Sequence, residues 1–352
     1  MRRVYLSLGI LLVLGVITFI LLKKEEEEIK KEPTILKYQP VKIEKSKIKK
    51  VVIEQYPLEG GERSKELQRI VIVRGEKGND EGEGWEIVEP VKSEADKYSV
   101  KSLLKRLDEL KFLDIASEQK KAHEELMVDE KQGIKVRVFY EKDKKVAELI
   151  IGKSSGGFTM VRLPGEDKVY RVKGTIRYVF SKPLRQWRNR KILKLDRNKI
   201  ARVEFINKNG HFAFERDVSG SSPKEWKVVL SKPKLKDFDP SRLNTIVNSL
   251  ASLTAYDFLD PPYTAKPGLS KEDNPAKVII TVKKDGGEET YTLLIGNQQI
   301  IAGSNEKGNY YAKLEGKDQI YVISKYLGER FTPTLDKLQK SSTSSKTSSS
   351  KK

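Results

Sequence analysis

Residues 96–110, DKYSVKSLLKRLDEL, decide the fold expected for this chain, because their pattern returns 143 residues later as DPSRLNTIVNSLASL at 239–253. In both stretches apolar residues fall at i, i+3, i+4, i+7 and i+10, which places them on one face of an amphipathic helix. Asp96 and Asp239 lead the two stretches, where a carboxylate can cap the free N–H groups of a first helical turn. The spacing predicts two copies of a whole domain rather than an array of short repeats.

Strand-like runs accompany each predicted helix in the same order. Ahead of it they cover 51–53, 70–73 and 85–88 in the first copy, and 203–206, 212–214 and 226–229 in the second. After it, alternating apolar residues predict a hairpin, then a further strand, and then the strand at 169–172 or 320–323. At this last strand the two copies are further apart in sequence than they are at the helix, so the second copy carries extra residues near 297–309. We therefore expect an α+β fold of two tandem repeats, each a mostly antiparallel sheet with one long amphipathic helix.

Three pairs of residues stand at matching places and are expected to anchor the repeats. A tryptophan begins one strand-like run in each copy, where a large aromatic ring can seal the helix against the sheet. Stacking of these rings on a sugar or polymer is the alternative interpretation. A glycine ends each predicted hairpin, and an aspartate leads each helix. The six anchors are Trp85, Trp226, Asp96, Asp239, Gly152 and Gly296.

Residues 4–22 form an uninterrupted run of 19 residues without a charge. At about 1.5 Å of rise per residue, a helix of this length spans roughly the hydrocarbon core of a bilayer. No small-residue cleavage site follows, so the run is predicted to be an uncleaved transmembrane signal-anchor after a short N-terminus at 1–3. The numbers of basic residues just before and just after this run are nearly equal, so they do not decide its orientation. The basic start still favours a cytoplasmic N-terminus, with the bulk of the chain periplasmic or otherwise extracytoplasmic.

The remaining boundaries follow from composition. Residues 23–48 are charged and broken by prolines, which predicts a stalk. The first repeat is expected at 49–195 and the second at 196–338. Residues 339–352 consist mostly of Ser, Thr and Lys, which predicts a disordered tail. A cationic tether onto an anionic surface is the alternative for this tail.

The charge balance indicates anionic partners. The chain has 69 Lys and Arg against 50 Asp and Glu, a formal net charge of +19 at pH 7. Such an excess favours lipid headgroups, anionic cell-envelope polymers or nucleic acid. Lysine is spread over every segment and mixed with glutamate, which argues against a nucleic-acid groove. One basic cluster surrounds an aromatic residue and is the candidate binding surface, with an inter-repeat connector as the alternative. Its members are Arg185, Trp187, Arg188 and Arg190.

No pattern of reactive residues stands out. The chain has no cysteine, which excludes disulfides, a thiol nucleophile and thiolate metal sites. His123 and His211 are its two histidines, and neither has the neighbours of a zinc site or a catalytic triad. Acidic pairs lie in lysine-rich stretches typical of a solvated surface. We therefore expect no catalytic residue, no metal site and no cofactor.

Five landmarks follow one another in the first copy: WEIVEP at 85–90, the Asp-led helix at 96–110, Ile-Gly at 151–152, the Val-Tyr strand at 169–172 and WRNRKIL at 187–193. In this order they resemble a bacterial family known as domain of unknown function 4340. The resemblance covers residues 50–195 and, more loosely, 200–335, where the second Trp-Arg ending is missing. It implies a bacterial inner-membrane, single-pass protein, of which relatives often accompany ABC-type exporter components, including those of gliding motility. It implies no enzymatic residue.

Together these features predict a non-catalytic, membrane-anchored scaffold or accessory subunit of an ABC-type transport or envelope assembly. Two linked domains raise the effective concentration for an extended partner. A module that binds an anionic cell-envelope polymer through its basic surface is the alternative. A glycan hydrolase is a third possibility, and it requires two facing carboxylates in a cleft.

Overall fold

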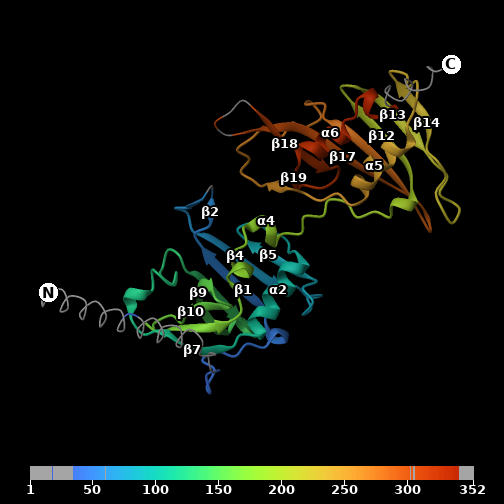
Figure 1. Ribbon diagram of the computed structural model, residues 1–352. Coiled ribbons are helices and arrows are strands. Elements are labelled where there is room, and N and C mark those ends of the chain that lie inside the picture. Colours follow the sequence, from blue (N-terminus) through green and yellow to red (C-terminus); the bar gives the residue numbers. More distant parts are fainter. Residues whose placement is uncertain (1–17, 19–34, 60, 302, 304–305, 341–352) are drawn as a thin grey trace, which may run out of the picture. The chain divides into compact units, whose positions relative to one another are not determined.

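The computed structural model describes residue 18 and residues 35–59, 61–301, 303 and 306–340 (Figure 1). The chain divides into two compact units between Pro183 and Leu184. The predicted anchor at 4–22 lies outside the described residues except for Thr18, as do residues 23–34 of the predicted stalk and 341–352 of the tail. Within the described part of the chain, no helix is long and apolar enough to cross a membrane.

The first unit is built on a nine-stranded sheet with the order β6-β5-β4-β1-β8-β9-β10-β11-β7. Every strand pair in it is antiparallel. The strands are β1 (Lys50–Gln55), β4 (Gln68–Arg74), β5 (Trp85–Glu89), β6 (Ser93–Glu94), β7 (Phe112–Ser117), β8 (Ile134–Phe139), β9 (Lys145–Ser155), β10 (Phe158–Arg162) and β11 (Val169–Lys173). A separate small hairpin joins β2 (Leu58–Glu59) to β3 (Glu62–Arg63), and the helical segments are η1 (Lys45–Lys47), α2 (Lys97–Asp108), η2 (Lys120–Ala122), η3 (Glu141–Asp143) and α3 (Arg177–Phe180).

The second unit is built on an eight-stranded sheet with the order β14-β13-β12-β16-β17-β18-β19-β15, again with antiparallel pairs. The strands are β12 (Ile200–Asn207), β13 (Gly210–Glu215), β14 (Lys227–Lys232), β15 (Asp257–Leu259), β16 (Ala276–Lys284), β17 (Gly287–Ile300), β18 (Lys307–Leu314) and β19 (Ile320–Ile323). Its helical segments are α4 (Leu184–Trp187), η4 (Arg197–Lys199), α5 (Pro240–Ala251), α6 (Lys325–Phe331) and η5 (Leu335–Lys337).

The two sheets have the same strand order once the two-residue β6 is set aside. In each unit the strands along the sheet are the third, second, first, fifth, sixth, seventh, eighth and fourth in the chain. The long helix, α2 or α5, lies between the third and fourth strands along the chain in both units. The prediction of an α+β fold with mostly antiparallel sheets is therefore confirmed.

The long helix of each unit buries the stripe of apolar side chains that the sequence predicts. On α2, Val100, Leu103, Leu104 and Leu107 are fully buried. On α5, the buried side chains are Leu243, Ile246, Val247 and Leu250. In the second unit these residues share one hydrophobic core with side chains from β12, β13, β16 and β17, so the helix covers one face of the sheet. This burial stabilises a helix of only 12 residues, which would be marginal alone.

Both helices begin at a capping aspartate, as predicted. The Asp96 carboxylate accepts a hydrogen bond of 2.8 Å from the Ser99 N–H, and Asp239 accepts one of 2.9 Å from the Ser241 N–H. Replacement of Asp96 by alanine leaves that N–H without its partner, so we expect the free energy of unfolding to fall by about 1 kcal/mol. Urea denaturation of the two chains measures the change. Asp96→Asn keeps an acceptor and is expected to restore most of the loss; equal losses in both variants would contradict the capping role.

Trp85 and Trp226 are buried rather than exposed on the surface. Trp85 is fully buried and Trp226 is 4 % exposed. A guanidinium group lies over each indole ring, Arg74 at 4.9 Å and Arg216 at 4.4 Å from the ring centroid. The two rings are therefore held at matching places by the same kind of cation–π contact, and neither presents its face to solvent.

A loop crosses each sheet at the glycine that ends the Ile-Gly pair. In the first unit Lys153 donates its N–H to the Leu126 carbonyl at 2.9 Å, and in the second Asn297 donates to the Pro267 carbonyl at 2.8 Å. A Cβ on Gly152 would lie 2.4 Å from the Leu126 oxygen, and a Cβ on Gly296 would lie 2.1 Å from the Pro267 oxygen. Only glycine lets the loop approach the strand this closely.

The predicted stalk and tail are partly packed against the units. Within the described part of the stalk, Ile43 and Ile48 are buried, and Leu36 donates its N–H to the Phe112 carbonyl at 3.1 Å. These isolated apolar residues carry no periodic pattern, so the sequence gives no sign of their burial. At the other end, Gln339 forms a β-bridge with Phe238, so the packed chain extends past residue 338.

Tyr170 of β11 is a buried phenol with an acidic partner. It is 8 % exposed, meets Phe112 edge to face, and donates a hydrogen bond of 2.9 Å to Glu166. Burial, together with the hydrogen bond and charge of Glu166, raises the pKa of Tyr170 to about 12. Because the pKa is higher folded than unfolded, the stabilisation is complete below about pH 10 and is lost as the pH rises toward 12.

This linkage predicts a difference between the natural chain and Tyr170→Phe. From pH 9 to pH 11 the free energy of unfolding of the natural chain should fall by about 1 kcal/mol more than that of the variant. Urea unfolding at the two pH values measures the difference, and the variant subtracts the titration of all other groups. Parallel pH dependence in the two chains would show that Tyr170 titrates normally.

Candidate functional site

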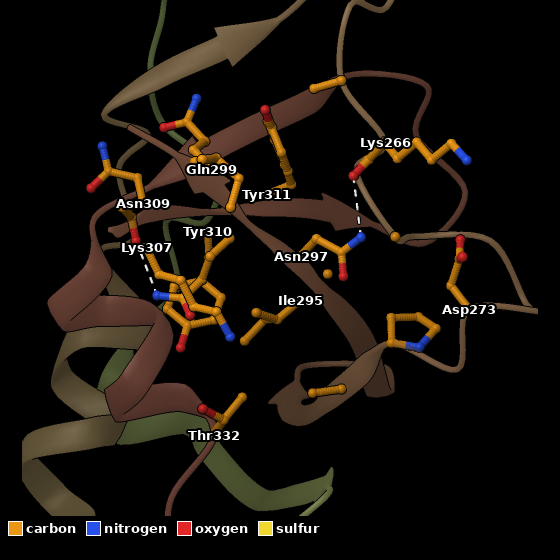
Figure 2. Close-up of a pocket in the computed structure, with 18 of the residues that line it drawn as sticks. Lys266, Asp273, Ile295, Asn297, Gln299, Lys307, Asn309, Tyr310, Tyr311 and Thr332 are labelled. Atoms are coloured by element: carbon orange, nitrogen blue, oxygen red, sulfur yellow. Dashed lines mark hydrogen bonds between the residues drawn. The ribbon is translucent and has the colours of Figure 1, made fainter. Parts of the chain in front are cut away.

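A large hollow lies in the second unit and has a volume of about 1040 Å³ (Figure 2). Its walls come from the loop at 265–276, the end of β17 and the start of β18, with Asn207, Lys208 and Thr332 at its border. The loop is held across β17 by the Asn297 N–H and the close approach at Gly296. The same glycine that shapes the fold therefore fixes one wall of the hollow.

Six amide side chains belong to the lining. They are Asn207, Asn274, Asn297, Gln298, Gln299 and Asn309. A side-chain amide carries two N–H donors and a carbonyl acceptor, so it can satisfy ligand groups of both kinds. The sequence run NQQ at 297–299, in the segment that lengthens the second copy, is the signal from which this site could have been predicted.

Three of these amides have an orientation fixed by the backbone. The Asn297 amide donates to the Lys266 carbonyl at 3.2 Å, and the Gln298 amide donates to the Gly308 carbonyl at 3.1 Å. Asn309 instead accepts from the Lys325 N–H at 3.1 Å. Figure 2 shows the first two bonds as dashed lines. Each bond uses one N–H or the oxygen of an amide. The carbonyl oxygens of Asn297 and Gln298, one N–H of each, and the NH₂ of Asn309 therefore have no hydrogen-bond partner among the described residues.

The charged groups of the lining are mainly positive. Lys208, Lys266 and Lys307 are exposed, and Asp273 is the one carboxylate among the described lining residues. Asp273 accepts hydrogen bonds from the Ser270 N–H at 3.0 Å and the Ser270 hydroxyl at 2.7 Å. These bonds lower the pKa of Asp273, so it is ionised at neutral pH and engaged with its own loop.

Tyr310 supplies an aromatic surface beside the amides. Its ring packs against Gly328 of α6 so closely that a Cβ on that glycine would lie 2.1 Å from a ring carbon. Burial, and then the charge of Glu329, raise the pKa of Tyr310, which keeps the hydroxyl protonated at neutral pH. The neighbouring Tyr311 is buried in a small apolar cluster with Ile320 and Val322. The lining thus offers neutral hydrogen-bonding groups with a positive border.

The hairpin lengths show why this hollow belongs to the second unit. In the first unit β9 ends at Ser155 and β10 begins at Phe158, so only residues 156–157 connect them. In the second unit β17 runs to Ile300 and β18 begins at Lys307. The lengthened ends of these two strands carry Gln298, Gln299 and Asn309. The extra residues of the second copy therefore form a wall of the hollow.

The predicted basic surface at 185–190 is partly buried. Trp187 is fully buried and Arg188 is 2 % exposed. Arg188 donates to Asp260 at 2.6 Å and to Gln319 at 2.8 Å, and its guanidinium lies 3.6 Å from the centroid of the Phe258 ring. These partners come from distant parts of the sequence, which is why the residue resembles a surface arginine in the sequence alone.

The two other members of the cluster are half-buried. Arg185 lies 3.8 Å from Asp257 and over the ring of Tyr256, while Arg190 has no ion pair among the described residues. Residues 184–195 lie in the second unit, whereas the sequence analysis assigns them to the first repeat. The Ile192 N–H bonds to the Leu253 carbonyl at 2.9 Å, which ties this segment to the end of α5. The four residues do not form a single exposed patch.

The histidines and acidic groups make ordinary structural contacts. His123 bonds to the Asp167 carbonyl at 2.9 Å, and His211 lies 2.5 Å from Glu204. Burial opposes ionisation of Glu204, but hydrogen bonds from Arg202 and His211 outweigh it and lower the pKa of this carboxyl. Among the described residues, no group of three or more His, Asp and Glu side chains could hold a metal ion.

The architecture is that of a two-unit α+β chain with one amide-lined hollow. A family model described as a domain of unknown function (DUF4340) matches residues 85–275, which is more than half of the chain. The chain belongs to this family. The match starts at Trp85 and ends at Pro275, so it includes parts of both units, whereas the resemblance in the sequence suggested residues 50–195 as the main region. No curated protein and no solved structure matches the chain.

Proposed function

We propose that this protein is a non-catalytic accessory subunit of an envelope assembly, and that its second unit carries the binding site for that assembly's ligand. The observation that carries the proposal is the amide-lined hollow. Its described lining contains one carboxylate, Asp273, which bonds to Ser270. Hydrolysis of a glycosidic bond commonly uses two carboxyl groups that flank the bond, so the lining favours binding over the hydrolase alternative.

We further propose that the two units arose by duplication of one ancestral domain. The identical strand order supports this, as do the capping aspartates and the loop that crosses at Gly152 and Gly296. The first unit has a short turn in place of the lengthened hairpin. In this proposal the first unit serves as a docking scaffold, and the second has gained a ligand site.

Membrane attachment through residues 4–22, with both units outside the cytoplasm, completes the proposal. The uncharged run of 19 residues supports it. Partners of the scaffold would be subunits of an ABC-type transporter or another envelope complex, as the family resemblance implies. An anionic cell-envelope polymer is the second candidate partner, favoured by the net charge of +19 and by the lysines at the hollow.

Cross-linking in intact cells tests the accessory role. An affinity-tagged full chain is cross-linked, solubilised from membranes and isolated, and we expect integral transport subunits to be recovered in a fixed ratio to it. A membrane protein of similar abundance, tagged in the same way, is the control for chance proximity. Isolation of the chain alone, or digestion of its units by a protease applied only to the cytoplasmic side, would contradict the proposal.

A further inference from the structure

We propose that the hollow of the second unit binds an acidic oligosaccharide, that is, a chain of hydroxyl-bearing sugars with carboxylates. The proposal rests on the ligand-binding role given above and names the chemical class of the ligand. It starts from the orientation of the amides. Because backbone groups hold Asn297, Gln298 and Asn309, the groups left over offer two carbonyl acceptors, on Asn297 and Gln298, and N–H donors on all three amides.

This combination selects for hydroxyl groups. A carbonyl acceptor needs a ligand group that donates, and an NH₂ needs one that accepts. A phosphate dianion or a carboxylate only accepts hydrogen bonds, so it leaves the Asn297 and Gln298 carbonyls without partners. A sugar hydroxyl both donates and accepts, and a ring carries several of them. The protonated Tyr310 hydroxyl adds a further group that can donate or accept.

The lysines select for negative charge on that hydroxyl-rich ligand. Three lysines against one engaged aspartate give the lining a net positive charge. The positive charge of the described lining comes from lysines, which attract an anionic group as point charges. A volume of about 1040 Å³ lies at the upper end of small-molecule sites, which favours several sugar rings over one.

A peptide ligand fits the hollow less well. Extended peptides commonly add a strand to an exposed sheet edge. Here β17 pairs with both β16 and β18 only as far as Ile295. Beyond it, β17 pairs with β18 on one side, and on the other the Asn297 N–H is already bonded to the Pro267 carbonyl. Recognition at this place must therefore come mainly from side chains, and those side chains are amides.

Binding by isothermal titration calorimetry of the purified full chain tests the class of ligand. Tetramannuronate is the acidic sugar, mannotetraose is its neutral counterpart, and tetraglutamate carries the same charge without sugar hydroxyls. We expect tetramannuronate to bind most tightly, with an affinity that falls as salt rises from 50 to 300 mM, and mannotetraose to bind more weakly and with little salt dependence. Tetraglutamate as tight as tetramannuronate, or no sugar binding at 1 mM ligand, overturns the proposal.

Variants place the binding at the hollow. Gln299→Ala breaks no hydrogen bond among the described residues, and we expect it to weaken tetramannuronate binding about three- to tenfold. Replacement of both Lys266 and Lys307 by alanine should weaken tetramannuronate binding and leave mannotetraose binding unchanged. The controls are Asn248→Ala on α5 and Lys283→Ala near the opposite end of β16, both exposed, and neither should change either affinity.

The pattern of losses decides between outcomes. Equal affinities in the hollow variants and the control variants overturn the assignment of the site. Recovery of transport subunits by cross-linking does not depend on any sugar, so the ligand class can fail while the accessory role stands. The reverse result, sugar binding without a recovered partner, would support the site and contradict the accessory role.

Discussion

Replacement of Gly296 by alanine is expected to lower the free energy of unfolding by about 3 kcal/mol or more. The new methyl group would lie 2.1 Å from the Pro267 carbonyl oxygen and 2.7 Å from that of Gly268, and backbone atoms cannot move aside as a flexible side chain can. The loop at 265–276 must then leave β17, which breaks the Asn297 N–H bond to Pro267. Urea denaturation measures the loss, and hydrogen exchange of β16 to β18 locates it.

Gly286 in the same unit provides the control for this substitution. A Cβ there meets no atom within 4 Å, and its backbone is outside the left-handed region, so Gly286→Ala should be nearly neutral. Gly152→Ala should lower the stability of the first unit for the same reason as Gly296→Ala, since its Cβ would lie 2.4 Å from the Leu126 oxygen. Similar stability of the Gly286 and Gly296 variants would mean that the loop tolerates displacement.

Replacement of Arg188 by alanine is expected to cost about 3 kcal/mol. The guanidinium is 2 % exposed and is the charged partner of Asp260, at 2.6 Å. Its removal leaves a half-buried carboxylate without its cation and also removes the contact with the Phe258 ring, at 3.6 Å. The midpoint of urea unfolding measures the loss. Arg188→Lys should not keep the stability of the natural chain, because a single ammonium cannot bind Asp260 and Gln319 together in the geometry of the guanidinium fork.

Two variants separate this structural role from a role in binding. Arg190→Ala removes a neighbouring charge without an ion pair among the described residues, so its effect on stability should stay within about 0.5 kcal/mol. The double change Arg188→Met with Asp260→Leu removes both charges, and it should recover part of the stability lost in Arg188→Ala. A stable Arg188→Ala chain with weakened binding to an anionic polymer would instead support the predicted basic surface.

The parts of the fold that sequence analysis predicted are those with a periodic pattern. The stretches at 96–110 and 239–253 became α2 and α5, and the alternating run at 134–138 became β8. The strand that follows each long helix, β7 or β15, has no such pattern, and β15 has only three residues, none of them fully buried. Burial of Ile43 and Ile48 was missed for a related reason, since isolated apolar residues in a charged segment carry no repeat.

Apart from the NQQ run at 297–299, the sequence gives no sign of the hollow, because the other groups of its lining come together only in three dimensions. Asn207, the loop at 265–276 and the segment after Gly296 are separated by tens of residues, and polar side chains have no spacing rule that marks a shared surface. Arg188 is the opposite case, because the sequence predicts an exposed basic side chain and the structure buries it. Its carboxylate partner lies 72 residues away, so a basic run in the sequence gave no sign of a buried ion pair.

The lengthened hairpin has a consequence for how such chains can diversify. The loop at 265–276 is bonded to β17 at Asn297, where the extra residues of the second copy begin. The residues that follow this bond can therefore change without disturbing the hydrophobic core. Family members that vary in length between the sixth and seventh strands along the chain should therefore share one scaffold while they differ in the ligand they bind.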